Sequence, residues 1–253
     1  MLEEFLKLNA YVFIVIFSRI GTIMIFIPVL GSTRILARGR LFLGLAISFL
    51  LTPIMSDILP VMPEKPIKLG LLIMGEILAG AFLGLIVRIM FSATQTAGTI
   101  ISFVAGMANT MVYDPVVEQQ SAIAAGFMGS IATLLLFVTN MHHLLIEAMI
   151  ESYMLLQPGI LPNLGDMAQM MARQISDAFK LGVQLATPFI IVSLAYYIGL
   201  GVLTRLAPQI PIFFVAMPLQ IIISMVIFSL VIGGMMTVYL REFREHIQPF
   251  IGS

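Results

Sequence analysis

The fold of this chain is decided by stretches such as residues 69–90, which read LGLLIMGEILAGAFLGLIVRIM. Only Glu76 and Arg88 are ionisable in this stretch. A run of this length can cross the hydrocarbon core of a bilayer as a helix. A helix is favoured because it satisfies all of its backbone hydrogen bonds within the segment, whereas a lone strand in lipid does not. The stretch therefore predicts a transmembrane helix.

Comparable apolar runs recur along the whole chain. The six runs are residues 8–30, 41–59, 69–90, 122–139, 181–206 and 212–240. The fourth is interrupted at Asn140, after which helical periodicity resumes through residues 142–156. Pro188 and Pro218 lie inside the last two runs, where proline kinks a helix. We therefore expect an all-α membrane protein with about six long apolar helices, several kinked or broken by proline, ending in a helical hairpin.

The overall composition excludes several classes of protein. Hydrophobic residues make up 60% of the chain and charged residues 10%, whereas a soluble domain carries about a quarter charged residues. The net charge is zero, and no basic stripe exists that would neutralise nucleic-acid phosphates. The absence of cysteine rules out disulfides and thiolate metal sites. We expect a protein that is surrounded by lipid, by other apolar protein or by both, and that binds no nucleic acid.

Chemical motifs are sparse. His142, His143, Glu147 and Glu151 form the cluster most like a metal or acid–base site, but they do not make an HExxH pattern. No glycine-rich phosphate loop and no nucleophile–base pair with plausible spacing is present. The sequence therefore predicts neither an enzyme nor a bound cofactor or metal.

Three charged residues, Arg19, Glu76 and Arg88, lie within or near the ends of apolar runs. An ionised group in that position costs about 2.5–3.5 kcal/mol by insertion scales, so it needs a partner or water. Arg19 and Glu76 are the deepest, and they could pair with each other or with another subunit. An ion pathway, a structural salt link or a helix end that lies shallower in the membrane would explain them. We favour the latter two over the ion pathway, because an ion relay needs a chain of such groups.

Residues 91–107 differ from the apolar runs, because they are small and polar yet compatible with a helix. Such a surface suits contact with protein or water better than contact with lipid. Small-xxx-small spacings at Gly80 and Gly84, Ala122 and Gly126, and Ala125 and Gly129 predict close helix packing without showing which helices meet.

The side of the membrane on which the termini lie is indicated by arginines. With six spans both termini share one side, and arginines 34, 38, 40, 88 and 205 lie on the other. Because Lys and Arg in short loops favour the cytoplasm, we expect both termini outside it.

Four groups of residues, in order along nearly the whole chain, carry a family resemblance. They are SRIG at 18–21 with PVLG at 28–31 and ARGR at 37–40, Gly106 with MVYDP at 111–115, HHLL at 142–145 with SY at 152–153, and RLAPQIPIFFVAMP at 205–218. Together they resemble the FliR family, the export-gate subunit of flagellar type III secretion, whose virulence-system relatives are the SctT-type proteins. The last motif departs from the family at Pro211, where the family has Asn, and at Ala216, where it has Gly.

The resemblance implies a structural pore-forming subunit of the flagellar export gate in the bacterial inner membrane, within the basal body. Such a subunit assembles with FliP-like and FliQ-like subunits, and unfolded flagellar proteins pass through the assembly. Residues 1–180 would correspond to a FliP-like part and residues 181–253 to a FliQ-like hairpin. In such an assembly the helices largely stand above the ordinary bilayer plane.

The resemblance also implies roles for particular residues. The segment 106–120 would be a pore-plugging loop, carrying Met107, Met111, Val112, Tyr113, Asp114 and Pro115. Met and aromatic side chains can close a pore to ions and still yield to a passing chain. The turn with Arg205, Pro208, Gln209 and Pro211 would face the cytoplasm near an FlhB-like partner.

The sequence is also compatible with a second function. A secondary transporter of a small solute could use Glu76, Arg19 and the cluster between His142 and Glu151, with Pro188 and Pro218 as helix breaks near its binding site.

Overall fold

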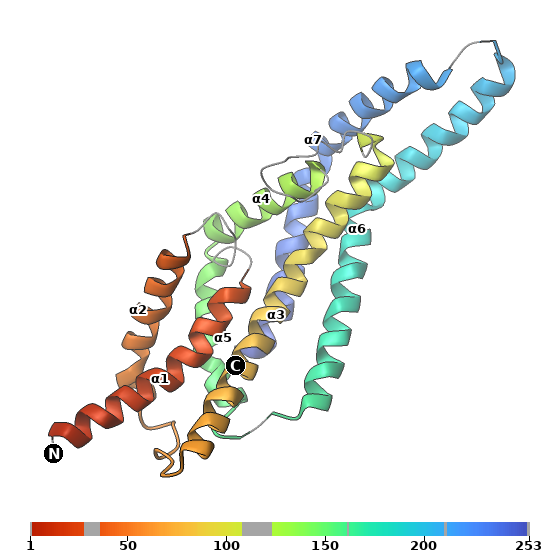
Figure 1. Ribbon diagram of the computed structural model, residues 1–253. Coiled ribbons are helices and arrows are strands. Elements are labelled where there is room, and N and C mark those ends of the chain that lie inside the picture. Colours follow the sequence, from red (N-terminus) through yellow and green to blue (C-terminus); the bar gives the residue numbers. More distant parts are fainter. Residues whose placement is uncertain (1, 28–35, 108–122, 161, 210–211, 252–253) are drawn as a thin grey trace. The chain divides into compact units, whose positions relative to one another are not determined.

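The computed structural model describes residues 2–27, 36–107, 123–160, 162–209 and 212–251. In these ranges the regular elements are helices, and no strand occurs (Figure 1). The elements are α1 (Leu2–Phe26), α2 (Ala37–Met55), α3 (Pro66–Val104), α4 (Ile123–Val138), α5 (Met141–Leu155), α6 (Leu164–Leu206), α7 (Ile212–Ile247) and a final 3₁₀ turn, η2 (Gln248–Phe250). The predicted all-α fold is confirmed.

The apolar runs correspond to these helices. Among the described residues, four segments are long and apolar enough to cross a membrane, namely Ala37–Met55, Pro66–Val104, Leu164–Leu206 and Ala216–Phe250. The bent pair α4 and α5 makes a fifth if it is counted as one span, and Ala10–Phe26 is a shorter apolar helix. The chain is therefore a helical membrane protein.

Helix α3 is longer than the sequence predicts. The run 69–90 and the polar run that follows it join into one helix of 39 residues. The hydroxyl groups of Thr96 and Thr99 donate to the carbonyls of Ser92 and Gln95, one turn earlier, at 3.1 and 2.8 Å. These two hydroxyl groups bond within their own helix, and the run stays helical through Val104.

The interruption predicted at Asn140 is confirmed. Helix α4 ends at Val138 and α5 begins at Met141, with a bend of 76° between them. Asn140 has φ of 58°, in the left-handed region. Asn adopts this conformation more readily than most residues, because its short polar side chain bonds locally.

Helix α6 unites two segments that differ in composition. Its 43 residues contain the amphipathic stretch 166–180 and the fifth apolar run, with Pro188 inside the helix. Asp166 lies in its first turn and Arg205 in its last, so each charge complements the helix dipole. Because α6 is unbroken at residue 180, the division into parts 1–180 and 181–253 does not coincide with a helix end. That division stays a prediction.

The chain forms two compact units whose segments alternate along the sequence. Unit 1 comprises Met1–Met90, Asn140–Ile175 and Glu245–Ser253, and unit 2 comprises Phe91–Thr139 and Ser176–Arg244. Each unit is therefore built from pieces that lie far apart in the sequence.

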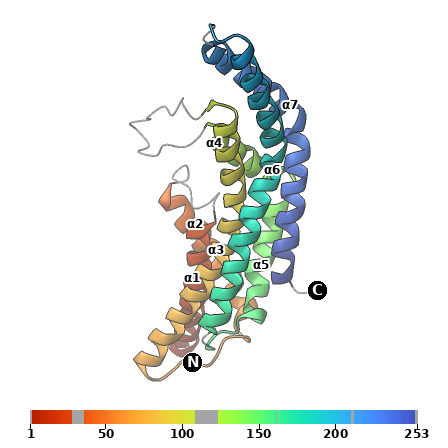
Figure 2. The ribbon, with the colours of Figure 1, turned by 90° about the vertical axis from the view of Figure 1, so that its right-hand side faces the viewer.

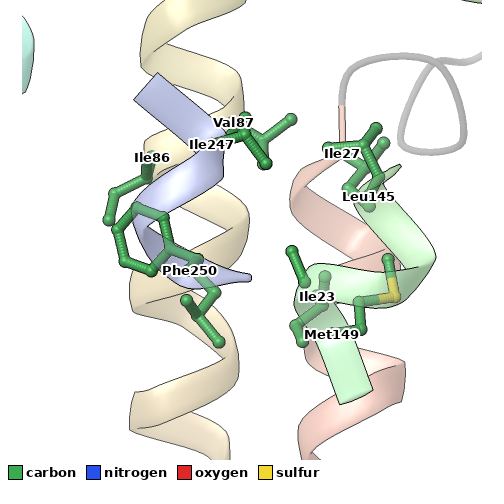
Figure 3. A pocket seen from close by; sticks show the side chains of 10 residues that line it. Ile23, Ile27, Ile86, Val87, Leu145, Met149, Ile247 and Phe250 are labelled. Carbon is green, nitrogen blue, oxygen red and sulfur yellow. The ribbon is translucent and has the colours of Figure 1, made fainter. Parts of the chain in front are cut away.

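Unit 1 has an apolar core to which α1, α3, α5 and the C-terminal turn contribute. Figure 3 shows side chains of this core around a small cavity of about 20 Å³. Ile247 and Phe250, near the end of the chain, line the cavity and are 1% and 3% exposed. The C-terminal turn is therefore part of the core of unit 1.

Unit 2 contains the predicted C-terminal hairpin. After α6 the chain turns at Pro208 and Gln209, and α7 runs back beside α6 (Figures 1 and 2). The Phe228 ring of α7 packs 5.8 Å from the Phe189 ring of α6 and 5.7 Å from the Phe127 ring of α4. The hairpin is confirmed, and α4 packs against it.

Candidate functional sites: a buried charge cluster and the polar end of helix α3

Arg19 and Glu76 meet inside unit 1. Arg19 Nε donates to Glu76 Oε2 at 2.7 Å, and Arg19 Nη2 donates to Glu76 Oε1 at 3.0 Å. Their side chains are 1% and 2% exposed. This two-bond geometry is the strongest form of an arginine–carboxylate contact. The pair joins α1 to α3.

The remaining donors of Arg19 bind the end of α5. Nη1 donates to the Ser152 carbonyl at 2.9 Å and to Ser152 Oγ at 3.3 Å, and Nη2 donates to the Leu156 carbonyl at 2.7 Å. The guanidinium carbon lies 4.1 Å from the centre of the Tyr153 ring. The Ser152 carbonyl also accepts the Leu156 N–H at 2.9 Å, and a cation beside the last carbonyls of a helix is favourable.

The whole hydrogen-bonding capacity of the guanidinium is therefore used. Arginine has five N–H donors, and all of them are accounted for by Glu76, Ser152 and Leu156. Such a cluster connects α1, α3 and α5 and leaves neither charge poised to bind a solute. The geometry favours the structural salt link over the ion pathway.

Arg88 lies apart from this cluster. It follows Glu76 by 12 positions on α3, which turns it about 120° around the helix axis. Its side chain is exposed, whereas that of Glu76 is buried.

The histidine cluster forms the start of α5. The rings of His142 and His143 lie 4.1 Å apart. Within the described residues no three His, Asp or Glu side chains gather where they could hold a metal ion.

A second polar site lies in unit 2, at the C-terminal end of α3. The Val104 carbonyl accepts a hydrogen bond from Ser193 Oγ of α6 and another from Gln220 Nε2 of α7, each at 2.7 Å. Gln220 Nε2 also donates to the Tyr197 hydroxyl oxygen at 3.1 Å. Ser193 is 8% exposed and Gln220 is 6% exposed, so the two donors to the Val104 carbonyl are buried, whereas Tyr197 is 49% exposed.

The same network connects the two arms of the hairpin. The Tyr196 hydroxyl of α6 donates to the Ala216 carbonyl of α7 at 2.5 Å. Gly106, two residues beyond α3, has φ of 73° and lies against the Gln220 side chain. A left-handed glycine is a common way for a helix to end, because glycine has no Cβ to clash. The chain therefore leaves α3 immediately next to Gln220.

The predicted plug residues lie just beyond this site. Met107 is half-buried, and Met111, Val112, Tyr113, Asp114 and Pro115 lie outside the described residues. In the predicted partner-facing turn, Arg205, Pro208 and Gln209 are exposed, and Pro211 lies outside the described residues. The roles of both segments remain predictions.

The sequence reasoning did not identify Ser193, Tyr196, Tyr197 and Gln220 as site residues. The available signal was that each is polar within an otherwise apolar run. Polar side chains at such positions form interhelical hydrogen bonds.

The glycines show where helices approach closely. A Cβ on Gly80 or Gly84 of α3 would meet atoms of α1, among them the Arg19 carbonyl and the Phe26 side chain. A Cβ on Gly98 of α3 would overlap backbone atoms of Ala125 in α4. Two of the three small-residue pairs thus include contact positions, whereas Gly126 faces open space.

These features define a polytopic helical membrane protein whose helices are joined by buried polar contacts. A family model described as bacterial export proteins, family 1, matches residues 10–246. The chain therefore belongs to this family of export proteins.

Individual relatives agree with the family match. The flagellar biosynthetic protein FliR of Caulobacter vibrioides is 30% identical over 242 residues, covering 96% of both chains. FliR of Bacillus subtilis is 30% identical over 219 residues, which are 85% of this chain and 83% of the relative. The secretion system apparatus protein SsaT of Salmonella typhimurium is 23% identical over 218 residues, 83% of this chain and 82% of the relative.

The resemblance to the FliR family and its secretion-system relatives is confirmed. Together with the apolar helices, it identifies the chain as a membrane component of the flagellar export apparatus.

Proposed function

We propose that this chain is a structural, non-enzymatic, pore-forming subunit of the flagellar type III export gate. It assembles with FliP-like and FliQ-like subunits in the bacterial inner membrane, within the basal body, and unfolded flagellar proteins pass through the assembly. The observation that carries the proposal is the family match over residues 10–246, which includes both the segment 106–120 and the C-terminal hairpin.

The lengths of two helices support a setting other than plain lipid. With a rise of 1.5 Å per residue, the 39 residues of α3 span about 60 Å and the 43 residues of α6 span about 65 Å. The hydrocarbon core of a bilayer is only about 30 Å thick. Each helix also carries a less apolar portion, residues 91–104 in α3 and 166–180 in α6. Partner subunits would cover what lipid does not.

Partner subunits can be identified by affinity purification of the tagged chain from native membranes. We expect FliP-like and FliQ-like subunits in fixed ratio to the chain. Since the chain contains no cysteine, Gln209→Cys introduces a single thiol at the exposed hairpin turn. A cross-link from this thiol to an FlhB-like subunit is expected, and Asp166→Cys, at the opposite end of α6, serves as the control. A stable lone chain without partners would contradict the proposal.

The plug role of segment 106–120 has its own test. Deleting residues 108–113 should leave the assembly intact and make membranes leaky to small ions. The readout is potassium release from vesicles that contain the purified assembly. A deletion variant that assembles and stays as tight as the wild type would reject the plug.

The geometry does not favour a secondary transporter. Both carboxylate oxygens of Glu76 are bound to Arg19, and the pair is buried. A coupling carboxylate has to exchange partners during a transport cycle, which this arrangement resists. Loss of coupled solute uptake in vesicles on Glu76→Gln, with the fold intact, would restore that function as a candidate.

A further inference from the structure

We infer that Gln220 is a positioning residue, which holds the end of α3 on the C-terminal hairpin and so fixes the point at which the segment 106–120 leaves the helix. This inference rests on the proposed function, because it concerns the root of the proposed plug. It does not depend on the placement of the segment itself.

The first argument is where the donors come from. The Val104 carbonyl receives one donor from each arm of the hairpin, Ser193 on α6 and Gln220 on α7. Helix α3 ends at Val104, and Gly106 turns the chain out of the helical path. A single backbone atom therefore connects three helices at the point where α3 ends.

The second argument is the chemistry of the glutamine. Its amide nitrogen has two hydrogens, of which one goes to the Val104 carbonyl and the other to the Tyr197 hydroxyl oxygen. A leucine of similar volume would supply neither. Because Gln220 is buried, the Val104 carbonyl would lose one of its two donors and keep Ser193, whereas the hydroxyl of Tyr197, which is 49% exposed, can bond to water instead.

The third argument is that hydrogen bonds also connect the two arms of the hairpin near Gln220. Gln220 bonds across to Tyr197, and Tyr196 bonds across to Ala216 four residues before Gln220. The two arms and the end of α3 thus form one connected network. Moving the hairpin arms at this level has to break these bonds or carry Val104 with them.

The direct test uses the assembled complex and a single introduced thiol. Met107→Cys places a cysteine three residues beyond Val104 in a chain that otherwise has none. We expect Gln220→Leu to increase the rate of labelling by a maleimide about fivefold, the effect of losing the one hydrogen bond to Val104, worth about 1 kcal/mol. Ser193→Ala should give a similar increase, and the double variant a larger one. Ser224→Ala, a buried serine one turn further along α7 that is not a donor to Val104, should label as the parent does.

The functional test is potassium release from vesicles that contain the assembled complex. Here the chain carries Gln220→Leu without Met107→Cys. We expect release several times faster than from wild type at an unchanged ratio of partner subunits. Unchanged labelling and unchanged release in an assembled Gln220→Leu complex would overturn the inference. If Gln220→Leu fails to assemble, Ser193→Ala decides by the same two readouts, because it removes only a hydroxyl.

The experiments distinguish failure of the plug role of segment 106–120 from failure of the positioning role of Gln220. If deletion of residues 108–113 causes a leak and Gln220→Leu changes neither readout, the positioning role is wrong and the plug stands. If labelling rises with Gln220→Leu but neither variant leaks, the positioning role stands and the plug is wrong.

Discussion

Arg19 shows how one residue can decide whether an apolar helix bundle is stable. Its guanidinium binds a carboxylate of α3 and two carbonyls at the end of α5 in a site that is 1% exposed. A buried pair of this kind stabilises little compared with an apolar core, but breaking it leaves one charge without compensation.

We therefore predict that Arg19→Met lowers the free energy of unfolding by about 3–5 kcal/mol, because Glu76 is left buried and unpaired. The measurement is denaturation of the purified assembly. The double variant Arg19→Met with Glu76→Leu should recover part of the loss, since it removes both charges. Arg88→Met, at an exposed position, is the matched control and should be near neutral. An Arg19→Met loss no larger than that of the control would contradict the structural role.

Asn140 is a second residue whose role is local. Its φ of 58° lies where a β-branched side chain is strained. We predict that Asn140→Val lowers the free energy of unfolding by about 1–2 kcal/mol, while Asn140→Gly changes it by a few tenths. Thermal unfolding of the assembly measures both. Equal effects of the two substitutions would show that the backbone at residue 140 is not the cause.

At the scale of elements, the close contacts of α3 depend on glycines at two places along its length. Gly80 and Gly84 lie against α1, and Gly98 lies against α4. The same helix thus carries close packing in both units. Its small residues are spaced for helix contact, as in membrane helices generally.

Substitution of Gly98 tests the α3–α4 contact. A Cβ at this position would overlap the backbone of Ala125, which cannot move aside as a side chain tip can. We predict that Gly98→Ala lowers the free energy of unfolding by about 1–3 kcal/mol, the usual effect of overpacking. Gly126→Ala is the matched control on α4, because nothing lies within 4 Å of its added Cβ. It should be neutral or slightly stabilising, since Ala is the better helix former. Equally small changes in the free energy of unfolding for Gly98→Ala and Gly126→Ala would show that α3 and α4 do not meet at Gly98.

At the scale of the whole molecule, exposed apolar side chains are the dominant feature. Large hydrophobic residues more than half exposed occur on most helices, for example Phe49, Phe127, Leu194 and Leu230. Two helices are also about twice as long as the hydrocarbon core is thick. Lipid can cover part of this surface, and in the proposed assembly partner chains cover the rest.

We predict that the chain made without its partner subunits is short-lived in membranes, and that co-expression of FliP-like and FliQ-like subunits raises its steady-state level severalfold. The physical reason is that binding only to the folded state stabilises it by mass action. Quantitative immunoblotting of membranes with and without the partners measures the effect. Equal levels in both would argue that the chain is complete by itself.

The sequence predicted the elements well and their contacts poorly. The runs 41–59 and 212–240 correspond to α2 and α7, and the break at Asn140 lies where periodicity fails. The length of α3 was missed, because Ser and Thr side chains weaken an apolar run without ending a helix. The Arg19–Glu76 pair was foreseen as an option, whereas Ser152, Leu156 and the network around Gln220 were not.

That this is a helical membrane protein of an export family follows from the amino-acid sequence, because apolar length and ordered motifs are properties of local stretches. Which buried groups meet follows only from the folded structure. Arg19 bonds to Glu76 across 57 positions and to Ser152 across 133, and Gln220 reaches Val104 across 116. Such contacts depend on which face each helix turns toward its neighbours, and that is set by packing of the whole unit.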